Sequence, residues 1–442
     1  MKIEELAKVL RDAGVVGAGG AGFPSYAKLN KAADTIILNC AECEPLLKLH
    51  RQVLEKYAFE ILTALDYVSK AVGADKVIIA VKNSYQGAIN AVKANLASFK
   101  NVEIGILPEI YPAGDEVITI YETTGRVVPQ GNIPISVGVI VFNVETMLNA
   151  YNALKNGKPV TEKYVTVAGA VKNPITVKVP LGTSFAELLA LAGNPVIDSY
   201  EIVNGGPMTG PLGNINDTVT KTTNALLVLP SNSVVVEKKK NNLKVDVSRA
   251  KSACCQCRMC TDLCPRHLLG HSIEPHAFMN ALANNSASQP EAVINTLFCS
   301  QCGLCEMYSC FQGLSPRSLI GDCKGELRKN GVAIPKSETS SKADSKREFR
   351  RVPMNRLTAR LGLTQYNVPA PLDETVIKPS KVQIKLTQHI GAPCAAVVKT
   401  GDKVEVGQII GSTDEGKLGV NIHATISGTV IDVNDKFVTI KA

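Results

Sequence analysis

The amino-acid sequence predicts a multidomain fold that combines one α/β domain with β-rich modules and a small cysteine-rich domain. Helical and strand-like patterns alternate over residues 1 to about 155, which is typical of an α/β domain. Short strands and turns take over from Val165, and they return from Asn367 to the end of the chain. Between these β-rich parts, nine of the 13 cysteines lie from Cys254 to Cys310. A chain of 442 residues has room for roughly three or four such domains.

The α/β domain is expected over residues 1–158. Its first element is a short helix, one face of which is marked by Ile3, Leu6, Val9 and Leu10. Apolar runs at 35–38 and 76–81 predict buried strands, and helical periodicity covers 50–73 and 85–98. This alternation predicts a sheet that is covered by helices.

The other boundaries follow changes in composition. We expect a β-rich module at 159–236, a cysteine-rich domain at 245–333, a linker at 334–365 and a second β-rich module at 366–442. The lysine-rich stretch 237–244 is expected to be a solvated hinge, and the polar run Lys336–Arg350 is expected to be flexible. A helix is predicted over 184–192, and Asn434-Asp435 predicts a tight hairpin near the end of the chain.

Composition narrows the class of function. The formal net charge is +8, but Trp is absent and no basic stripe is interleaved with aromatic residues, so nucleic-acid binding is not expected. No apolar stretch has the length of a membrane-spanning helix, and we expect no transmembrane segment. Acidic residues follow Met1 closely, where a secretory signal would need an apolar core, so a cytoplasmic protein is expected. A cysteine cluster in that reducing compartment indicates metal rather than disulfides.

Two cysteine runs carry the strongest chemical signal. The first has the form C-x2-C-x2-C-x3-C followed by Pro, and the second has the form C-x2-C-x2-C-x4-C. In such ferredoxin-type spacing, three thiolates of a run bind one 4Fe–4S cluster and the fourth crosses to the other cluster. Cluster one is therefore assigned to Cys254, Cys257, Cys260 and Cys310. Cluster two is assigned to Cys299, Cys302, Cys305 and Cys264.

Zinc is the alternative for these cysteines, but structural zinc sites usually join two C-x2-C halves across a longer loop. The second run has one residue more than the usual spacing before Cys310, and Phe311 stands where Pro is expected. Cys255 and Cys323 are left over, and we interpret Cys255 as a bystander next to a ligand. Two clusters thus account for eight of the cysteines.

A glycine-rich turn and an acidic loop form the second signal. The turn Gly17-Ala-Gly-Gly-Ala-Gly-Phe-Pro follows a helix, whereas a dinucleotide fingerprint would follow a strand, so a Rossmann site is not predicted. The loop Asn39-Cys-Ala-Glu-Cys-Glu-Pro comes directly after a predicted strand. Glycines let backbone N–H groups approach a phosphate, and a nearby lysine adds positive charge.

These two loops resemble the flavin-binding domain that the flavin subunit of complex I shares with the RnfC proteins of Rnf-type electron transport. Further matches are the turn Gly114-Asp-Glu and the element Asn143-Val-Glu-Thr. The resemblance implies that FMN and NADH bind here, with Glu42 and Glu44 as catalytic residues. The residues it implies for cofactor binding are Gly17, Gly19, Gly20, Gly22, Phe23, Lys28, Asn39, Cys43, Gly114, Asp115, Glu116 and Asn143.

The β-rich modules extend this resemblance over most of the chain. The module with Gly205-Gly-Pro-Met looks like a soluble-ligand-binding β-grasp, and the C-terminal module looks like a barrel-sandwich hybrid. That hybrid is lipoyl-like, but Lys417 lacks the flanking residues of a modified lysine, so we expect it to be unmodified. The hybrid comes last here, and this order resembles the cobalamin reductases of propanediol-utilisation bacterial microcompartments.

The family resemblance implies an electron path: NADH reduces FMN, the two clusters receive single electrons, and a corrinoid accepts them. An adenosyltransferase and microcompartment shell proteins are the partners it implies. Two other interpretations are a general NADH-linked electron-transfer subunit that serves another microcompartment enzyme or a radical activase, and a non-enzymatic cluster-bearing component. The N-terminal helix could be an encapsulation tag, although packing as the first helix of the flavin domain is favoured.

Overall fold

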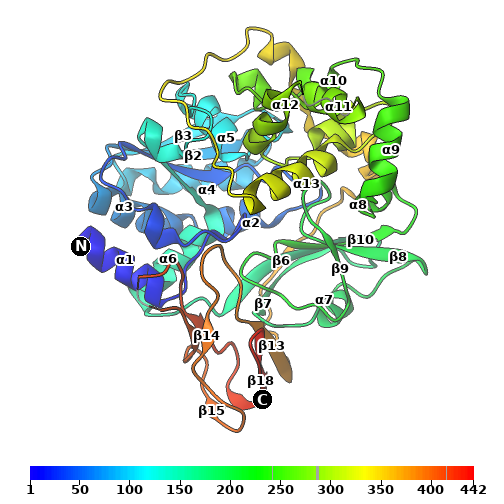
Figure 1. Cartoon of the computed structure of the whole chain (residues 1–442). Helices are drawn as coiled ribbons and strands as arrows, with labels where there is room; N and C mark the ends of the chain where they lie inside the picture. The colour runs from blue at the N-terminus through cyan, green and yellow to red at the C-terminus, as the bar shows by residue number, and fades with distance from the viewer. Residues whose placement is uncertain (241, 285–287, 415) are drawn as a thin grey trace.

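The structure is a computed structural model that describes residues 1–240, 242–284, 288–414 and 416–442 (Figure 1). Its first layer is a parallel four-stranded sheet of order β3-β2-β1-β5. The strands are β1 (Thr35–Cys40), β2 (Lys76–Lys82), β3 (Val102–Leu107) and β5 (Val139–Asn143). The strands predicted at 35–38 and 76–81 are therefore confirmed as the central pair of the sheet.

Helices cover both faces of this sheet, because successive strand residues point in opposite directions. The Ile36 and Leu38 face packs against most of the helices, whereas the Ile37 face packs against α5. The helices are α1 (Ile3–Asp12), α2 (Leu49–Lys56), α3 (Ala58–Val72), α4 (Gln86–Asn95), α5 (Glu116–Thr124) and α6 (Val144–Asn156). In α1, Leu6 and Leu10 are fully buried, so this helix packs as part of the domain.

A mixed six-stranded sheet of order β12-β7-β6-β10-β8-β9 follows. It contains β6 (Glu162–Gly169), β7 (Ile175–Pro180), β8 (Tyr200–Asn204), β9 (Leu212–Gly213) and β10 (Ala225–Pro230), with α7 (Phe185–Leu191) on it. The predicted helix over 184–192 is α7. The edge strand β12 (Leu372–Asp373) follows the cysteine-rich domain in the sequence and pairs in parallel with β7.

The cysteine-rich part is helical and lies at the end of the molecule opposite the C-terminal module (Figure 1). Its helices are α8 (Val234–Lys239), α9 (Leu243–Ala253), α10 (Met259–Asp262), α11 (Pro275–Ala283), α12 (Pro290–Ile294) and α13 (Pro316–Lys329). The expectation of a solvated stretch at 237–244 is wrong for Lys238 and Lys239, whereas Glu237, Lys240 and residues 242–244 are exposed. Lys238 donates to the Gly313 and Leu314 carbonyls and Lys239 donates to Gly210, because helix α8 carries both side chains inward.

The segment 334–365 leads from the cysteine-rich part to the C-terminal module, and the prediction that its polar run is flexible is wrong. Ser337 N donates to Gln130 O, and Arg347 is buried in an ion pair with Glu122. Strand β11 (Val352–Pro353) then pairs with β4 (Ile110–Tyr111), and α14 (Met354–Arg360) follows. Two charges of the run are thus used in contacts between modules, since Arg347 pairs with Glu122 of α5 and Arg350 pairs with Asp262 of α10.

The C-terminal module contains two small sheets, of orders β13-β19-β18-β15 and β14-β16-β17. Its strands are β13 (Lys381–Lys385), β14 (Ala395–Ala396), β15 (Lys403–Val404), β16 (Ile409–Ser412), β17 (Ile422–His423), β18 (Gly428–Val433) and β19 (Phe437–Lys441). The predicted hairpin at Asn434-Asp435 is confirmed between β18 and β19, where Asn434 Oδ1 accepts from two backbone N–H groups. In the described part of the chain, no helix combines the length and apolarity needed to cross a membrane.

Candidate functional site

The glycine-rich turn closes on itself between α1 and β1. Val16 and Pro24 form a β-bridge, and Gly17 N donates to Phe23 O at 2.9 Å. Ala18 N donates to Thr146 Oγ1 at 2.9 Å, which anchors the turn to α6. At Gly19 a Cβ atom would collide with the Asn143 side-chain amide, so only glycine fits this close approach.

This turn forms one wall of a cavity of about 770 Å³. Lys28 lies in the wall, where its Nζ donates to Glu116 Oε1 at 2.9 Å and to Val141 O at 2.8 Å. The structure brings together nine of the predicted cofactor-binding residues around this cavity: Gly17, Gly19, Gly20, Gly22, Phe23, Lys28, Asn39, Glu116 and Asn143. Ser25 and Thr146 also line it, and they were not singled out from the sequence because isolated hydroxyl residues carry no pattern.

A second cavity of about 820 Å³ shares Gly19, Gly20, Asn39 and Asn143 with the first. The predicted residues Glu42, Cys43, Glu44 and Gly114 line it, and Asn39 Nδ2 donates to Gly114 O at 2.9 Å. Its opposite wall comes from the second sheet, through Asn204, Gly205, Gly206, Thr209, Gly210, Thr222 and Asn224. The residues of this wall were not predicted from the sequence, because they come more than 150 residues after the acidic loop that they face.

Glu42 lies in this cavity wall as the buried member of an ion pair. Its Oε2 accepts from Arg51 Nε at 2.7 Å, and its Oε1 accepts from His50 N at 2.8 Å. Burial works to raise the pKa of Glu42, but the attraction of Arg51 and of His50 and the two hydrogen bonds outweigh it, and the pKa is lowered. This carboxylate is therefore ionised and fully engaged with protein groups.

Glu44 connects the acidic loop to the second sheet. Its carboxylate accepts from Met208 N at 2.8 Å, from Thr209 N at 3.0 Å and from Thr209 Oγ1 at 2.5 Å. A Cβ at Gly206 would collide with the Glu44 carboxylate, so glycine is required for this approach. Burial raises the pKa of Glu44, although these hydrogen bonds oppose the shift. The arrangement suits a residue that holds the β8–β9 loop over the cavity.

Asn143 is held in place by two hydrogen bonds. It is the N-cap of α6, with Oδ1 accepting from Glu145 N at 2.9 Å, and its Nδ2 contacts His50 Nε2 at 3.0 Å. Burial lowers the pKa of His50 to about 4, so a neutral ring nitrogen can accept from Asn143. Glu145 in turn forms a buried ion pair with Lys163 of β6. His50, which lines the second cavity, and Lys163 were missed because only the tertiary structure brings them next to Asn143 and Glu145.

The turn at Gly114 joins these cavities to the cysteine-rich part. Asp115 caps α5 and lies away from both cavities, in a bidentate ion pair with Arg266. Tyr111 is buried, and its hydroxyl donates to Cys302 O at 2.5 Å. Cys43 packs in the same apolar cluster as Cys302, and burial raises the pKa of its thiol to about 12. The second cysteine run thus lies directly behind the cavity wall.

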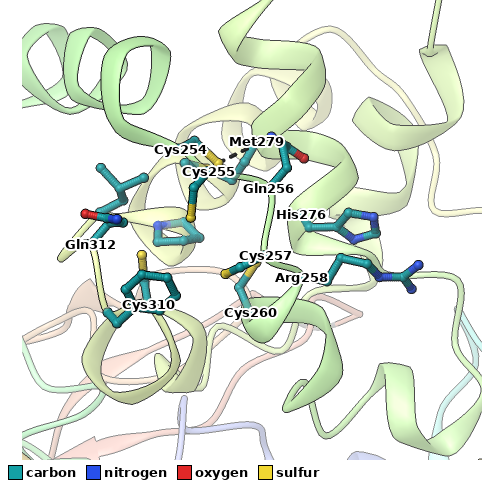
Figure 2. Close-up of a pocket in the computed structure, with 13 residues that line it drawn as sticks. Cys254, Cys255, Gln256, Cys257, Arg258, Cys260, His276, Met279, Cys310 and Gln312 are labelled. Atoms are coloured by element: carbon teal, nitrogen blue, oxygen red, sulfur yellow. Dashed lines mark hydrogen bonds between the residues drawn. The ribbon is translucent and has the colours of Figure 1, made fainter.

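The first set of assigned ligands surrounds one cavity of about 370 Å³ (Figure 2). Cys254 and Cys257 come from the loop that leads into α10, Cys260 lies in α10 itself, and Cys310 approaches from the other run. Burial raises the pKa of Cys260 to about 12, with further repulsion from Cys310, Cys257 and Cys254. Cys255 also borders this cavity, but it is exposed and is not among the groups that repel Cys260.

The second set is more deeply buried. Burial raises the pKa of Cys264 to about 12, with Cys299 adding repulsion. The pKa values of Cys302 and Cys305 are raised further by burial and by repulsion from Cys264 and Cys299. Each set therefore groups three thiols of one run with one thiol of the other. Such crowded thiols are costly to ionise on their own, and iron would offset that cost.

Comparisons with known proteins agree with this geometry. Residues 10–152 match the family model described as the Nuo51 FMN-binding domain, and residues 253–315 match the 4Fe-4S dicluster domain. Residues 164–212 match the SLBB domain, and residues 370–442 match the RnfC barrel sandwich hybrid domain.

Two curated proteins align with nearly the whole chain. The cobalamin reductase PduS of Citrobacter freundii is 42% identical over 437 residues, which cover 98% of this chain and 95% of that protein. The cobalamin reductase PduS of Salmonella typhimurium is 41% identical over 441 residues, or 100% of this chain and 97% of that protein. The chain belongs to the cobalamin reductase PduS family. The resemblance inferred from the loops and the domain order is thereby confirmed.

More distant relatives cover part of the chain. One component of the Na(+)-translocating ferredoxin:NAD(+) oxidoreductase complex of Acetobacterium woodii is 31% identical over 286 residues, 63% of this chain and 62% of that protein. Among solved structures, an NAD+-reducing [NiFe]-hydrogenase in the H2-reduced state is similar in fold, with a TM-score of 0.50 and 20% identity. That alignment covers 75% of this chain and 63% of the hydrogenase chain.

The residues present fit FMN and iron–sulfur clusters. Gly19 and Gly22 let the turn pack closely against the Asn143 side chain and Gln388 O, and Gly20 leaves open space in the cavity wall, with no atom within 4 Å of an added Cβ. Lys28 supplies a positive charge in the same cavity, as a phosphate site requires. The two sets of four thiols are the donor type that iron–sulfur clusters take. The chain is thus a mixed α/β multidomain protein with a flavin domain like that of complex I and a 4Fe–4S domain.

Proposed function

We propose that this chain is an NADH-dependent oxidoreductase that passes electrons through FMN and two 4Fe–4S clusters to a corrinoid, as a cobalamin reductase. The observation that carries the proposal is the full-length match to the cobalamin reductase PduS family, in a chain whose second flavin cavity adjoins the second cysteine set. When bound, FMN supplies two-electron acceptance and one-electron release, and the clusters supply single-electron transfer.

The protein residues bind, orient and separate these groups. The turn 17–23 and Lys28 would hold the phosphate end of the flavin, and Asn39 and Asn143, which line both cavities, would hold its ring and the nicotinamide. Glu42 and Glu44, first expected to be catalytic, act as positioning residues, because their carboxylates are engaged by Arg51 and by the Met208–Thr209 amides. Cys43, whose pKa is raised by burial, would present a neutral thiol to the second cavity.

The position of the cysteine sets suggests an order of electron transfer. Cluster two, on Cys264, Cys299, Cys302 and Cys305, lies behind the flavin wall, joined to it through the Tyr111 hydroxyl and the Asp115–Arg266 ion pair. Cluster one includes the exposed Cys257 and borders the exposed Phe311. The second cysteine set would therefore hold the cluster that receives electrons from the flavin domain, and the first set would hold the cluster that serves the acceptor.

The finer architecture follows the same family. The sheet of 159–236 would be a β-grasp module, and 366–442 would be an unmodified barrel-sandwich hybrid, supported by the matches at 164–212 and 370–442. Among the described residues of the C-terminal module, the two small sheets pack around one apolar core. The protein would work in a bacterial microcompartment, next to shell proteins and an adenosyltransferase that uses the reduced corrinoid.

An optical experiment on anaerobically purified protein tests this function. We expect a broad visible absorbance that NADH bleaches, and NADH-dependent reduction of aquacobalamin in the presence of FMN. A Gly19→Ala variant, which cannot form the glycine cradle, is the matched control and should retain the cluster absorbance but lose bleaching. A wild-type protein without iron would refute the proposal, and a rate no higher than that of free FMN would refute the corrinoid as acceptor.

A general electron-transfer component is the second candidate, because the relative from the ferredoxin:NAD(+) oxidoreductase complex aligns with 63% of the chain. Bleaching by NADH without cobalamin reduction above the free-flavin rate would favour it. Coloured protein that NADH fails to bleach would favour a non-enzymatic cluster-bearing component.

A further inference from the structure

Three modules meet at the tip of the glycine turn. A Cβ at Gly22 would lie 3.0 Å from Gln388 O and from the Cα of His389, both in the C-terminal module. It would also lie 3.1 Å from Thr222 Cγ2, in the segment between β9 and β10. Thr222 itself lines the second cavity. The tip of the turn is therefore enclosed by parts of the chain that come about 200 and 370 residues later.

Lys221 ties these modules to the start of the same turn. Its side chain is almost fully buried, and its Nζ donates to Gly14 O at 2.8 Å and to Asn421 O at 3.0 Å. Its backbone N donates to Gln388 Oε1 at 2.9 Å. One residue of the second sheet's module thus bonds to the flavin domain, just before the turn, and to two loops of the C-terminal module.

The charge of Lys221 is unusual for such a place. Among the described residues, no carboxylate pairs with its ammonium, and burial lowers its pKa to about 7. The neighbouring His423 is neutral, since burial lowers its pKa to about 3, and burial lowers the pKa of His389 as well. A buried ammonium is costly without an anion nearby. An anionic group on the glycine turn would reduce that cost electrostatically.

We propose that Lys221 is a positioning residue of the flavin site, which fastens the C-terminal module to both ends of the glycine turn so that the turn keeps its phosphate-binding shape. This inference rests on the proposed binding of FMN to that turn. It makes the C-terminal module a structural part of the flavin site, although its described residues line neither flavin cavity. The affinity for FMN then depends partly on hydrogen bonds between protein groups that do not contact FMN.

The test is the FMN dissociation constant of full-length Lys221→Met, measured by the quenching of FMN fluorescence in the absence of NADH and acceptor. Methionine keeps the length of the side chain but removes the bonds to Gly14 and Asn421. We expect affinity to fall by about tenfold, the usual effect of losing charge-assisted hydrogen bonds. The Lys417→Met variant is the matched control, because Lys417 is an exposed lysine of the C-terminal module and its loss should leave FMN affinity unchanged.

Activity gives a second readout. The FMN concentration needed for half-maximal NADH oxidation should rise about tenfold in Lys221→Met, while the rate at saturating FMN and the cluster absorbance stay at wild-type values. A folded Lys221→Met that binds FMN within about twofold of wild type would overturn the inference.

A further variant covers the case in which Lys221→Met fails to fold. Gln388→Ala removes the acceptor of Lys221 N, together with the local bond from Gln388 Nε2 to Lys385 O, and should weaken FMN binding severalfold. Unchanged affinity there would also overturn the inference. Failure of the proposed function looks different, because wild-type protein itself would then bind no FMN.

Discussion

The assignment of ligands across the two cysteine runs makes a quantitative prediction. In the structure, Cys310 borders the cavity of Cys254, Cys257 and Cys260, whereas Cys264 lies with the thiols of the second run. Two 4Fe–4S clusters hold about eight irons in total. Replacing either crossing ligand should therefore remove about four irons and leave the other cluster intact.

The two variants should differ in what NADH can reduce. Cys310→Ala removes cluster one, and cluster two behind Tyr111 should still be reduced by NADH at the wild-type rate. Cys264→Ala removes cluster two, so cluster one should keep its iron but lose rapid reduction, because its route from the flavin is interrupted. Both variants should lose aquacobalamin reduction if cluster one is the exit.

The assay combines iron analysis with electron paramagnetic resonance of the NADH-reduced and dithionite-reduced protein. Cys255→Ala serves as the control, since Cys255 is exposed beside Cys254 and should be dispensable. The reasoning fails if both crossing variants lose the same spectrum, or if Cys255→Ala loses iron as Cys310→Ala does. Rapid NADH reduction of the cluster left in Cys264→Ala would reverse the proposed order.

Two further substitutions test the flavin wall. Gly19→Ala should weaken FMN binding at least about tenfold in fluorescence titrations, because Asn143 cannot move aside without losing its two hydrogen bonds. The control Gly325→Ala lies at an exposed position of α13 where an added Cβ meets no atom within 4 Å, and it should bind FMN normally. Arg51→Met should lower the free energy of unfolding by about 3–5 kcal/mol at pH 7, since it leaves the Glu42 carboxylate buried and unpaired. The lowered pKa of Glu42 adds stability above its unfolded pKa of about 4.3 that is lost as pH falls through the folded value, so the deficit should narrow below about pH 5. Urea unfolding followed by circular dichroism measures this, and a deficit that is independent of pH would contradict it.

Local patterns in the sequence were enough to predict individual strands and turns and the types of cofactor. Strands β1 and β2 were predictable because buried parallel strands are continuous apolar runs, and the hairpin at Asn434 followed from its turn residues. The flexible run at 336–350 was wrongly predicted, because composition does not reveal that Arg347 meets Glu122 more than 200 residues away. Lys238 and Lys239 were wrongly interpreted for the same reason.

The sequence by itself determined which cofactors to expect, since cysteine spacing and a glycine turn are short-range patterns that constrain a ligand directly. It also determined the order of the modules and the family. Only the tertiary structure decided how the site is enclosed: the β8–β9 loop held by Glu44, the Asn143 side chain held by His50, and the turn held by Lys221. These contacts join residues 93 to 207 positions apart, and their partners are ordinary residue types that carry no local signal. Packing brings them together, so their roles become visible only in the fold.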